Sequence, residues 1–459
     1  QRPDGDPAAR DNRAKLSELL KTDQTILALG NLNNNFVTER LYFNGYTRAD
    51  SLWPGAGAFA LRTVHQPFNF GDINVLAVEA SDLEGARAGA LELAKRLPDS
   101  RDCALDQPLL FVSNTKPMGD EQRQKLLAGK PSASLLMEFH RACAAYRDSG
   151  DEAWALQAKR LMGLCRERLV TDPQYKLDWP EETSSNDIGK MWDVIEEAPV
   201  WSDTERAEAE NVIFATMLGM RRNVYNWGTF ANNDTIVWNH QTFPLLGVYW
   251  MARWLERWYP DRDVAGDYLA QVHGAFRGQL KSWKPQCDAD GYLTITPRHT
   301  IEYTLSRNDY RFFESGNVRQ FAEYLTGVCD NQGNIPGFGD SGYGKGPGYE
   351  LNGLPLALWY YKDPRYLWRL QQIYGGKWQN PYHTDIKPQP WPEIVGVNVY
   401  RMPAEYYKWA TTSSSYGEAT EKTEVTYEQS FDKISFREDI SRDGQFLLLD
   451  GFARGKHLQ

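Results

Sequence analysis

The spacing of apolar residues changes twice along the chain, and the first stretch, residues 1–115, has a mixed pattern. The segment "GDINVLAVEASDLEGARAGALELAKRL" predicts a strand over 73–78 and then an alanine-rich helix that Ser81 or Asp82 would cap. The segment "QPLLFVSN" predicts another strand. We therefore expect an N-terminal α/β domain built on a β-α-β unit. Because no GxGxxG follows the strand, we expect a structural or docking role instead of nucleotide binding.

The second stretch, residues 116–380, has apolar residues at the i, i+3, i+4 and i+7 spacing of amphipathic helices. The predicted helices are "SASLLMEFHRACAAYRDSG", "DEAWALQAKRLMGLCRERL", "DTERAEAENVIFATMLGMRRNVY", "TFPLLGVYWMARWLERWYP", "DYLAQVHGAFRGQLKSW", "NDYRFFESGNVRQFAEYLTG" and "LNGLPLALWYY". No strict repeat is present, which argues against a regular solenoid. Helical hairpins joined by glycine- and aromatic-rich loops fit better, as in an incomplete (α/α) toroid with a central cleft.

The third stretch, residues 381–459, follows a proline-rich connector and alternates apolar and polar positions. Its predicted strands are "VGVNVYRM", "YYKWATTSSS", "TEVTYEQS", "DKISFREDI" and "QFLLLDGFARGKHLQ". Short strands of this kind are typical of an antiparallel β-sandwich, and the strand pattern continues up to Gln459. We expect a multidomain α+β protein that ends within a β-domain.

Composition narrows the range of partners. The formal charge of -10 argues against nucleic acid and anionic membranes, although local arginines can still hold a carboxylate. The 16 tryptophans and 24 tyrosines suit sugar rings, but most are expected to fill helix-packing cores. No apolar run is long enough to span a membrane, and the start "QRPDGDPAARDN" is typical of a mature end after signal-peptide removal. We expect a secreted or periplasmic protein.

The segment "FANNDTIVWNHQTFPLLGVYW" places short polar residues before a long tryptophan-rich helix. Thr242 is the expected N-cap, with Pro244 in the first turn. Asn239 and His240 would then be neutral donors at the helix entrance, where they either hydrogen-bond a carboxylate or satisfy their own backbone. Further candidate binding residues in this segment are Asn233 and Trp238.

The segment "GYLTITPRHTIEYTLSRNDYRFFE" is rich in tyrosine and basic residues. Its candidate site residues are Arg298, His299, Tyr303, Arg307 and Tyr310. A tyrosine beside cations has a lowered pKa and is a candidate general base, although an ordinary amphipathic helix would also carry these residues.

Two weaker candidates come later in the chain. Asp340 in "NIPGFGDSGYGKGPGY" is either an orienting carboxylate or a turn residue, and His457 near a strand end is either catalytic or structural. Among the acidic residues, Glu181, Glu182, Asp193, Glu196 and Glu197 are expected mainly on solvated helix faces. The chain has no GxSxG, no HExxH and no zinc-type cysteine spacing.

Over residues 130–459 the sequence resembles the heparinase II/III and alginate lyase group of polysaccharide lyases. The resemblance rests on the order of "WNHQTF", of the tyrosine in "RHTIEY", of "NIPGFGDS" and of "GKH". It implies an (α/α) toroid followed by antiparallel sheets, with the substrate in the cleft between them. The N-terminal α/β region departs from better-known members and is similar to what accompanies some ulvan-type lyases.

The resemblance also implies roles for individual residues. Asn239 and His240 would neutralise the uronate carboxylate, Tyr303 would act as base or acid with Tyr310 as the fallback, and His457 would complete the site. Zinc-containing relatives have a histidine two residues beyond the last of these, where this chain has Gln459, which argues against a structural metal.

The implied reaction is β-elimination on an anionic polysaccharide such as ulvan or a related glucuronan, with no redox or organic cofactor. Arg298 or Arg307 would grip a sulfate or a second carboxylate, or hold Tyr303 ionised. Two alternatives stay open: a glycoside hydrolase on an α/α toroid, and a glycan-binding protein without catalysis.

Overall fold

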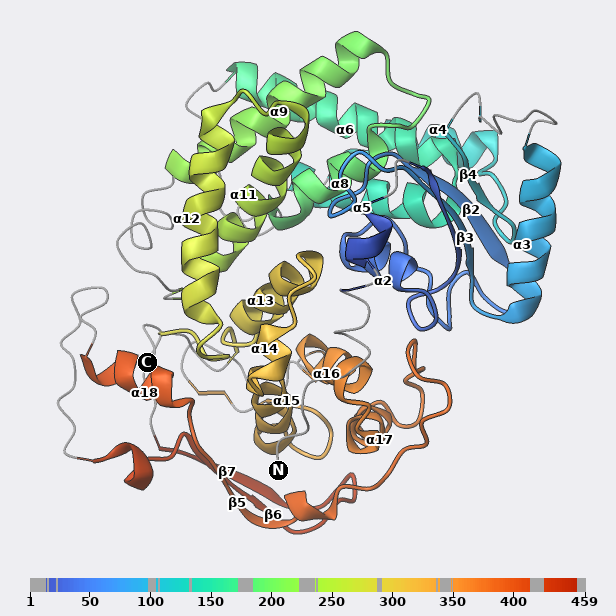
Figure 1. Ribbon diagram of the computed structural model, residues 1–459. Helices are drawn as coiled ribbons and strands as arrows, with labels where there is room; N and C mark the ends of the chain where they lie inside the picture. The colour runs from blue at the N-terminus through green and yellow to red at the C-terminus, as the bar shows by residue number, and fades with distance from the viewer. Residues whose placement is uncertain are drawn as a thin grey trace.

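The computed structural model shows a multidomain α+β chain with three regions (Figure 1). A mixed sheet with helices comes first, a large helical region follows, and a small antiparallel sheet comes last. The structure describes residues 14, 16–21, 24–97, 105, 108–131, 134–171, 185–222, 236, 238–286, 291–335, 337–338, 348, 350–412 and 425–451.

The N-terminal sheet has the strand order β1-β3-β2-β4. Its strands are β1 (Ile26–Gly30), β2 (Phe59–Val64), β3 (Val75–Ala80) and β4 (Leu110–Val112). β1 is parallel to β3, whereas β2 lies antiparallel between β3 and β4. The predicted strand-helix-strand unit is therefore present, with an antiparallel strand inserted between its two parallel strands.

The helix of this unit, α3 (Leu83–Arg96), covers one face of the sheet (Figure 1). Asp82 is its N-cap and accepts a hydrogen bond from the amide of Gly85, which settles the choice between Ser81 and Asp82. A Cβ atom at Gly85 would collide with the carbonyl oxygen of Ala58, so only glycine lets α3 approach β2 this closely.

The helical region contains most of the helices that the sequence predicts. The α-helices after α3 and before the last sheet are α4 (Asp120–Ala128), α5 (Leu135–Ser149), α6 (Glu152–Thr171), α8 (Ile188–Ile195), α9 (Asp203–Arg222), α11 (Asn239–Trp258), α12 (Asp263–Gln279), α13 (Ile295–Ser306), α14 (Arg311–Glu314), α15 (Asn317–Val328), α16 (Leu354–Tyr361) and α17 (Pro364–Ile373). The short α2 (Phe36–Phe43) precedes β2. The helix predicted from "NDYRFFESGNVRQFAEYLTG" is two helices, because Gly316 has a φ of 84° and interrupts it.

The last sheet is antiparallel in the order β5-β6-β7, with β5 (Gly396–Tyr400), β6 (Lys433–Arg437) and β7 (Phe446–Asp450). The strand predicted from "YYKWATTSSS" is wrong, since α18 (Ala404–Thr412) occupies that segment. Tyr406 and Trp409 are three residues apart and both buried, which is helical spacing. The strand predicted from "TEVTYEQS" is also wrong, because a 3-10 turn covers Tyr427–Gln429.

Aromatic residues fill the interior as expected. The tryptophans that are less than 2% exposed are Trp192, Trp238, Trp250, Trp254 and Trp283. One hydrophobic cluster joins the N-terminal region to α5–α12, and a second joins α13–α17 to the last sheet. The tyrosine of interest, Tyr303, lies at the edge of the first cluster.

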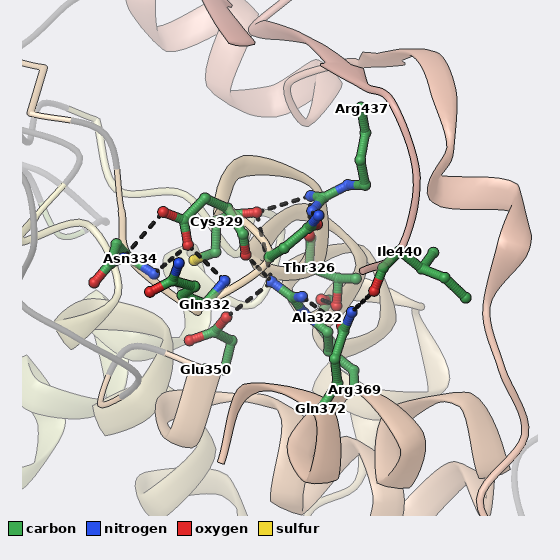
Figure 2. A network of polar contacts seen from close by, with 12 residues as sticks. Ala322, Thr326, Cys329, Gln332, Asn334, Glu350, Arg369, Gln372, Arg437 and Ile440 are labelled. Atoms are coloured by element: carbon green, nitrogen blue, oxygen red, sulfur yellow. Dashed lines mark hydrogen bonds and ion pairs between the residues drawn. The ribbon is translucent and has the colours of Figure 1, made fainter. Parts of the chain in front are cut away.

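Buried polar contacts fix the last sheet against the helices (Figure 2). Arg437 of β6 donates to the carbonyl of Cys329 at 2.8 Å, and Arg369 of α17 donates to the carbonyl of Asp330 at 2.6 Å. Arg369 also forms an ion pair with Glu350, and both side chains are fully buried. Because these guanidinium groups donate to backbone carbonyls just beyond α15, they connect that segment to α17 and to β6.

None of the helices in the described part of the chain is long and apolar enough to cross a membrane. Cys143, Cys165 and Cys329 are buried, and none of the three forms a disulfide. Cys103 and Cys287 lie outside the described residues.

Candidate functional site

The helix α11 begins earlier than the sequence predicts. Trp238 is its N-cap, with extended backbone angles, so Asn239 and His240 form the first turn. The predicted N-cap Thr242 is thus wrong. Its hydroxyl donates to the carbonyl of Asn239 at 3.1 Å and contacts Nδ1 of His299 at 2.7 Å, so this side chain joins α11 to α13.

The first turn of α11 has the electrostatic character of an anion site. The helix dipole adds partial positive charge there. Asn239 is 4% exposed, while His240 is half-buried with its ring 5.5 Å from that of Trp238. Of the predicted pair, His240 is therefore partly accessible at the helix N-terminus, whereas Asn239 is buried.

The helix α13 lies beside α11 and runs in the same direction (Figure 1). His299 of α13 is fully buried, with Phe243 packed against its ring and Arg298 3.2 Å from its Nε2. Burial, and then the charge of Arg298, hold the pKa of His299 well below its usual range. His299 is therefore neutral and packs in the interface between α11 and α13, which we call the α11–α13 seam. Arg298, in contrast, is exposed.

Tyr303 lies one turn further along α13 and belongs to a chain of polar contacts. Its hydroxyl is 2.8 Å from Nδ1 of His273 on α12, and Nε2 of His273 is 3.2 Å from a guanidinium nitrogen of Arg307. Because a guanidinium can only donate, Nε2 accepts and the proton resides on Nδ1, which then donates to the tyrosine oxygen. Arg307 is exposed, so the chain reaches the surface.

Burial reverses the predicted shift of the tyrosine pKa. The ring of Tyr303 is stacked on Phe276 at 4.2 Å and is 5% exposed. This desolvation raises the pKa of Tyr303 above its usual value despite the nearby charge of Arg307. The expectation of a lowered pKa is thus wrong, and Tyr303 is a protonated phenol at neutral pH.

His273 is a residue that the sequence analysis missed. Its pKa is lowered to about 4, chiefly by burial and then by Arg307, Arg253 and Arg277. Three arginines therefore surround the Tyr303–His273 pair although the chain as a whole is acidic. The only signal in the sequence is a histidine inside the predicted helix "DYLAQVHGAFRGQLKSW".

The low pKa of His273 predicts a dependence of stability on pH. The histidine has an ordinary pKa of about 6.5 when unfolded and about 4 when folded, so the unfolded state binds more protons between these values. We expect stability to be lost as the pH falls from about 6.5 to about 4. Replacing His273→Asn should reduce the loss, measured as urea midpoints at both pH values, and an unchanged loss would contradict this.

Asn239 and Tyr303 occupy different levels of the α11–α13 seam. The ring of Tyr303 contacts that of Tyr249 at 5.0 Å, and Tyr249 follows Asn239 by ten residues, which is about 15 Å of helix rise. A single sugar ring is much shorter than that. Asn239 and Tyr303 are therefore too far apart along the helix to contact one sugar ring together.

Tyr310 lies in the core and not at this seam. Its fully buried hydroxyl accepts from Arg40 and donates to Glu39, both at 2.7 Å, while Arg40 also donates to the carbonyl of Leu305 at the end of α13. These contacts join α2 to the C-terminal end of α13, which is a structural function.

We expect Tyr310→Phe to destabilise the fold by about 1–3 kcal/mol, because Arg40 and Glu39 would lose a buried partner. The matched control is Tyr366→Phe, since the buried hydroxyl of Tyr366 has no partner among the described residues. Denaturant unfolding measures both changes. Equal stability of the two variants would contradict the structural function.

Three predicted site residues, Asn233, Asp340 and His457, lie outside the described residues, as do Glu181 and Glu182. Of the other acidic candidates, Asp193 is buried in a contact with Arg257 and Tyr46. Glu196 and Glu197 are not on a solvated face: they line a cavity and are half-buried.

Within the described part of the chain, no group of three or more histidine, cysteine, aspartate or glutamate side chains is arranged to hold a metal ion. The chain matches no known protein-family model, and no curated protein is significantly similar to it.

Proposed function

We propose that this chain is a polysaccharide lyase that cleaves uronate-containing polysaccharide, such as ulvan or a related sulfated uronan, by β-elimination. The observation that carries the proposal is the hydrogen-bonded chain of Tyr303, His273 and Arg307 among three arginines. A proton-transfer group beside concentrated positive charge is what elimination from a sugar acid requires.

The first requirement of the reaction is that the enzyme stabilises the negative charge at the carboxylate of the substrate. The proton at C5 of a uronate is weakly acidic, because removing it adds negative charge next to the carboxylate. Arg307, Arg277 and Arg253 supply positive charge at the Tyr303–His273 pair and stabilise the enolate as it forms. Positive charge in a protein with a formal charge of -10 also guides an anionic polymer to this point.

Proton transfer is the second requirement. The C5 proton goes to a base, its electron pair forms the C4–C5 double bond, the C4–O bond breaks, and the leaving oxygen takes a proton. Tyr303 is the donor of that proton, because its raised pKa keeps it protonated and His273 stabilises the phenolate left behind. The resemblance implies that His457 completes the site, which makes His457 our proposed base once Tyr303 is the donor. These steps need no redox cofactor.

Asn239, His240 and Arg298 hold a neighbouring sugar of the same polymer. They lie at the start of α11 and α13, where the helix dipole and an exposed guanidinium favour a second carboxylate or a sulfate. A substrate that runs along the seam reaches both levels, so this arrangement favours long uronans over single sugars.

The finer architecture that accompanies this function is an incomplete (α/α) toroid followed by a β-sandwich. One face of the last sheet supports the sandwich, because Val397 is 63% exposed and Leu447 is 56% exposed on the two outer strands, β5 and β7. The register places Phe436 between them, so an apolar strip crosses all three strands. A second sheet packed on this strip would remove it from water.

The test is incubation with ulvan, heparan sulfate, alginate and glucuronan while the ultraviolet absorbance of the unsaturated product is followed. We expect the absorbance to rise with at least one of these polymers. New reducing ends without a rise would indicate a hydrolase, and retention of a polymer without any product would indicate a binding protein. Either result would overturn the proposal.

A further inference from the structure

A second feature with the properties of a ligand site lies at the other end of α11. A cavity of about 600 Å³ is formed where the N-terminal region meets the helices. Its lining residues are His65, Pro108, Glu196, Glu197, Pro199, Arg206, Glu210, Trp254, Trp258 and Tyr259. A volume of this size falls in the range of small-molecule sites. Because Trp254, which lines the cavity, follows Asn239 by 15 residues, about 22 Å of helix separates the two.

Aromatic rings form the walls of the cavity. The imidazole of His65 is stacked on the indole of Trp258, with ring centres 5.5 Å apart and an angle of 7° between the planes. The rings of Trp254 and Tyr259 form a second pair at 5.9 Å. Among the described residues, none bonds to the buried indole N–H of Trp258. Flat apolar faces with polar edges match the C–H faces and hydroxyls of a sugar ring.

Two adjacent carboxyl groups project into the same cavity. One oxygen of Glu196 accepts from the indole of Trp254 at 3.0 Å, and one oxygen of Glu197 accepts from the backbone amide of His65 at 3.1 Å. The other oxygen of each has no hydrogen-bond partner among the described residues. Both carboxyl groups are therefore held in place and keep capacity for a ligand.

The charge of the cavity distinguishes between classes of ligand. Burial, and then the charge of Glu197, raise the pKa of Glu196 well above its usual value, and burial raises the pKa of Glu197 to about 7. A protonated carboxyl and a partly protonated one are a donor and an acceptor, and the third carboxyl of the lining, that of Glu210, accepts from the hydroxyl of Tyr259. Arg206 is engaged by Asp203 and by the carbonyl of Glu196, so an anion gains little here.

We propose that this cavity is a second carbohydrate site, which binds one or two neutral sugar residues between the aromatic rings and the carboxyl groups of Glu196 and Glu197. It is independent of the elimination site, since the two share only the helix α11. In a polymer that contains both acidic and neutral sugars, it would hold a neutral part of the chain away from the point of cleavage.

The experiment is calorimetric titration of the full chain with cellotriose, xylotriose and mannotriose, and with choline and a glucuronate trisaccharide for comparison. We expect at least one neutral trisaccharide to bind. His65→Ala should weaken its binding about tenfold, because a stacking ring is lost. Glu197→Gln, which keeps the shape of the side chain, should also weaken it.

His383→Ala is the matched control, because His383 is not among the residues that line the cavity, and Tyr303→Phe should bind the sugar like the wild type. Circular dichroism confirms that each variant is folded. The proposal is overturned if no neutral trisaccharide binds, if both cavity variants bind as the wild type does, or if choline or the glucuronate trisaccharide binds more tightly. None of these results depends on whether the chain is a lyase.

Discussion

Tyr303→Phe should lower kcat on a uronan roughly 100- to 10,000-fold, the range that a positioned acid or base contributes. The variant loses only the hydroxyl that His273 contacts, while the ring keeps its stacking on Phe276 and its edge-to-face contact with Tyr249. We therefore expect a large effect on turnover and a small one on thermal unfolding. Initial rates of chromophore formation measure the first, and a melting curve measures the second.

A second substrate distinguishes whether Tyr303 acts as a proton donor or as a base. A uronate with a nitrophenyl group on its 4-oxygen has a leaving oxygen that needs no proton. If Tyr303 is the donor, as its raised pKa indicates, Tyr303→Phe should cleave this substrate at nearly the wild-type rate. An equal loss on both substrates would make Tyr303 the base, and full activity on the polymer would remove it from the mechanism.

Asp432→Asn should destabilise the protein by about 3–5 kcal/mol, because it leaves the buried ammonium group of Lys284 without its counter-ion, whereas Lys433 keeps its pair with Asp450. Asp432 is fully buried and bonds Lys284 through both carboxylate oxygens, at 2.8 and 2.6 Å, with Lys433 3.4 Å away. Burial opposes ionisation, but the two lysines outweigh it and lower the pKa of Asp432. The pair connects the segment after α12 to the start of β6.

The matched control is Glu92→Gln, which breaks the exposed pair with Lys95 and should change stability little. The double variant Lys284→Met with Asp432→Asn should be less destabilised than the sum of the two single changes. In the double variant no ammonium group of Lys284 is left buried without a counter-ion. Urea unfolding measures all four proteins. Additive effects, or a small effect of Asp432→Asn, would show that the pair does not hold the sheet to the helices.

The helical pattern was predictable because helix periodicity and caps are local. Ser134 caps α5 and Gly150 ends it in the left-handed conformation, and both signals are legible in the sequence. The start of α11 was not predictable from the sequence, because Thr242 followed by Pro244 has the pattern of an N-cap and a first helical turn. In the structure the hydroxyl of Thr242 bonds His299, a partner 57 residues away that no local pattern specifies.

The chemistry of the site depended on tertiary packing in the same way. His273 reaches Tyr303 only because α12 and α13 both pack against α11, and its position within a predicted amphipathic helix gave no sign of that. The direction of the Tyr303 pKa shift depends on burial against Phe276, which outweighs the arginine that the sequence made visible. Glu196 and Glu197 were expected in solvent because the loop that carries His65 is distant in sequence.

The most direct measurement is the mass of the products released from a uronan in water labelled with heavy oxygen. Elimination forms a double bond without adding water, so the newly formed non-reducing end should be an unsaturated uronate that is lighter by one water than the same end after hydrolysis. Products whose ends are all saturated and that contain a labelled oxygen would mean that water attacked the glycosidic bond. That result would contradict the elimination and the function of Tyr303 in it.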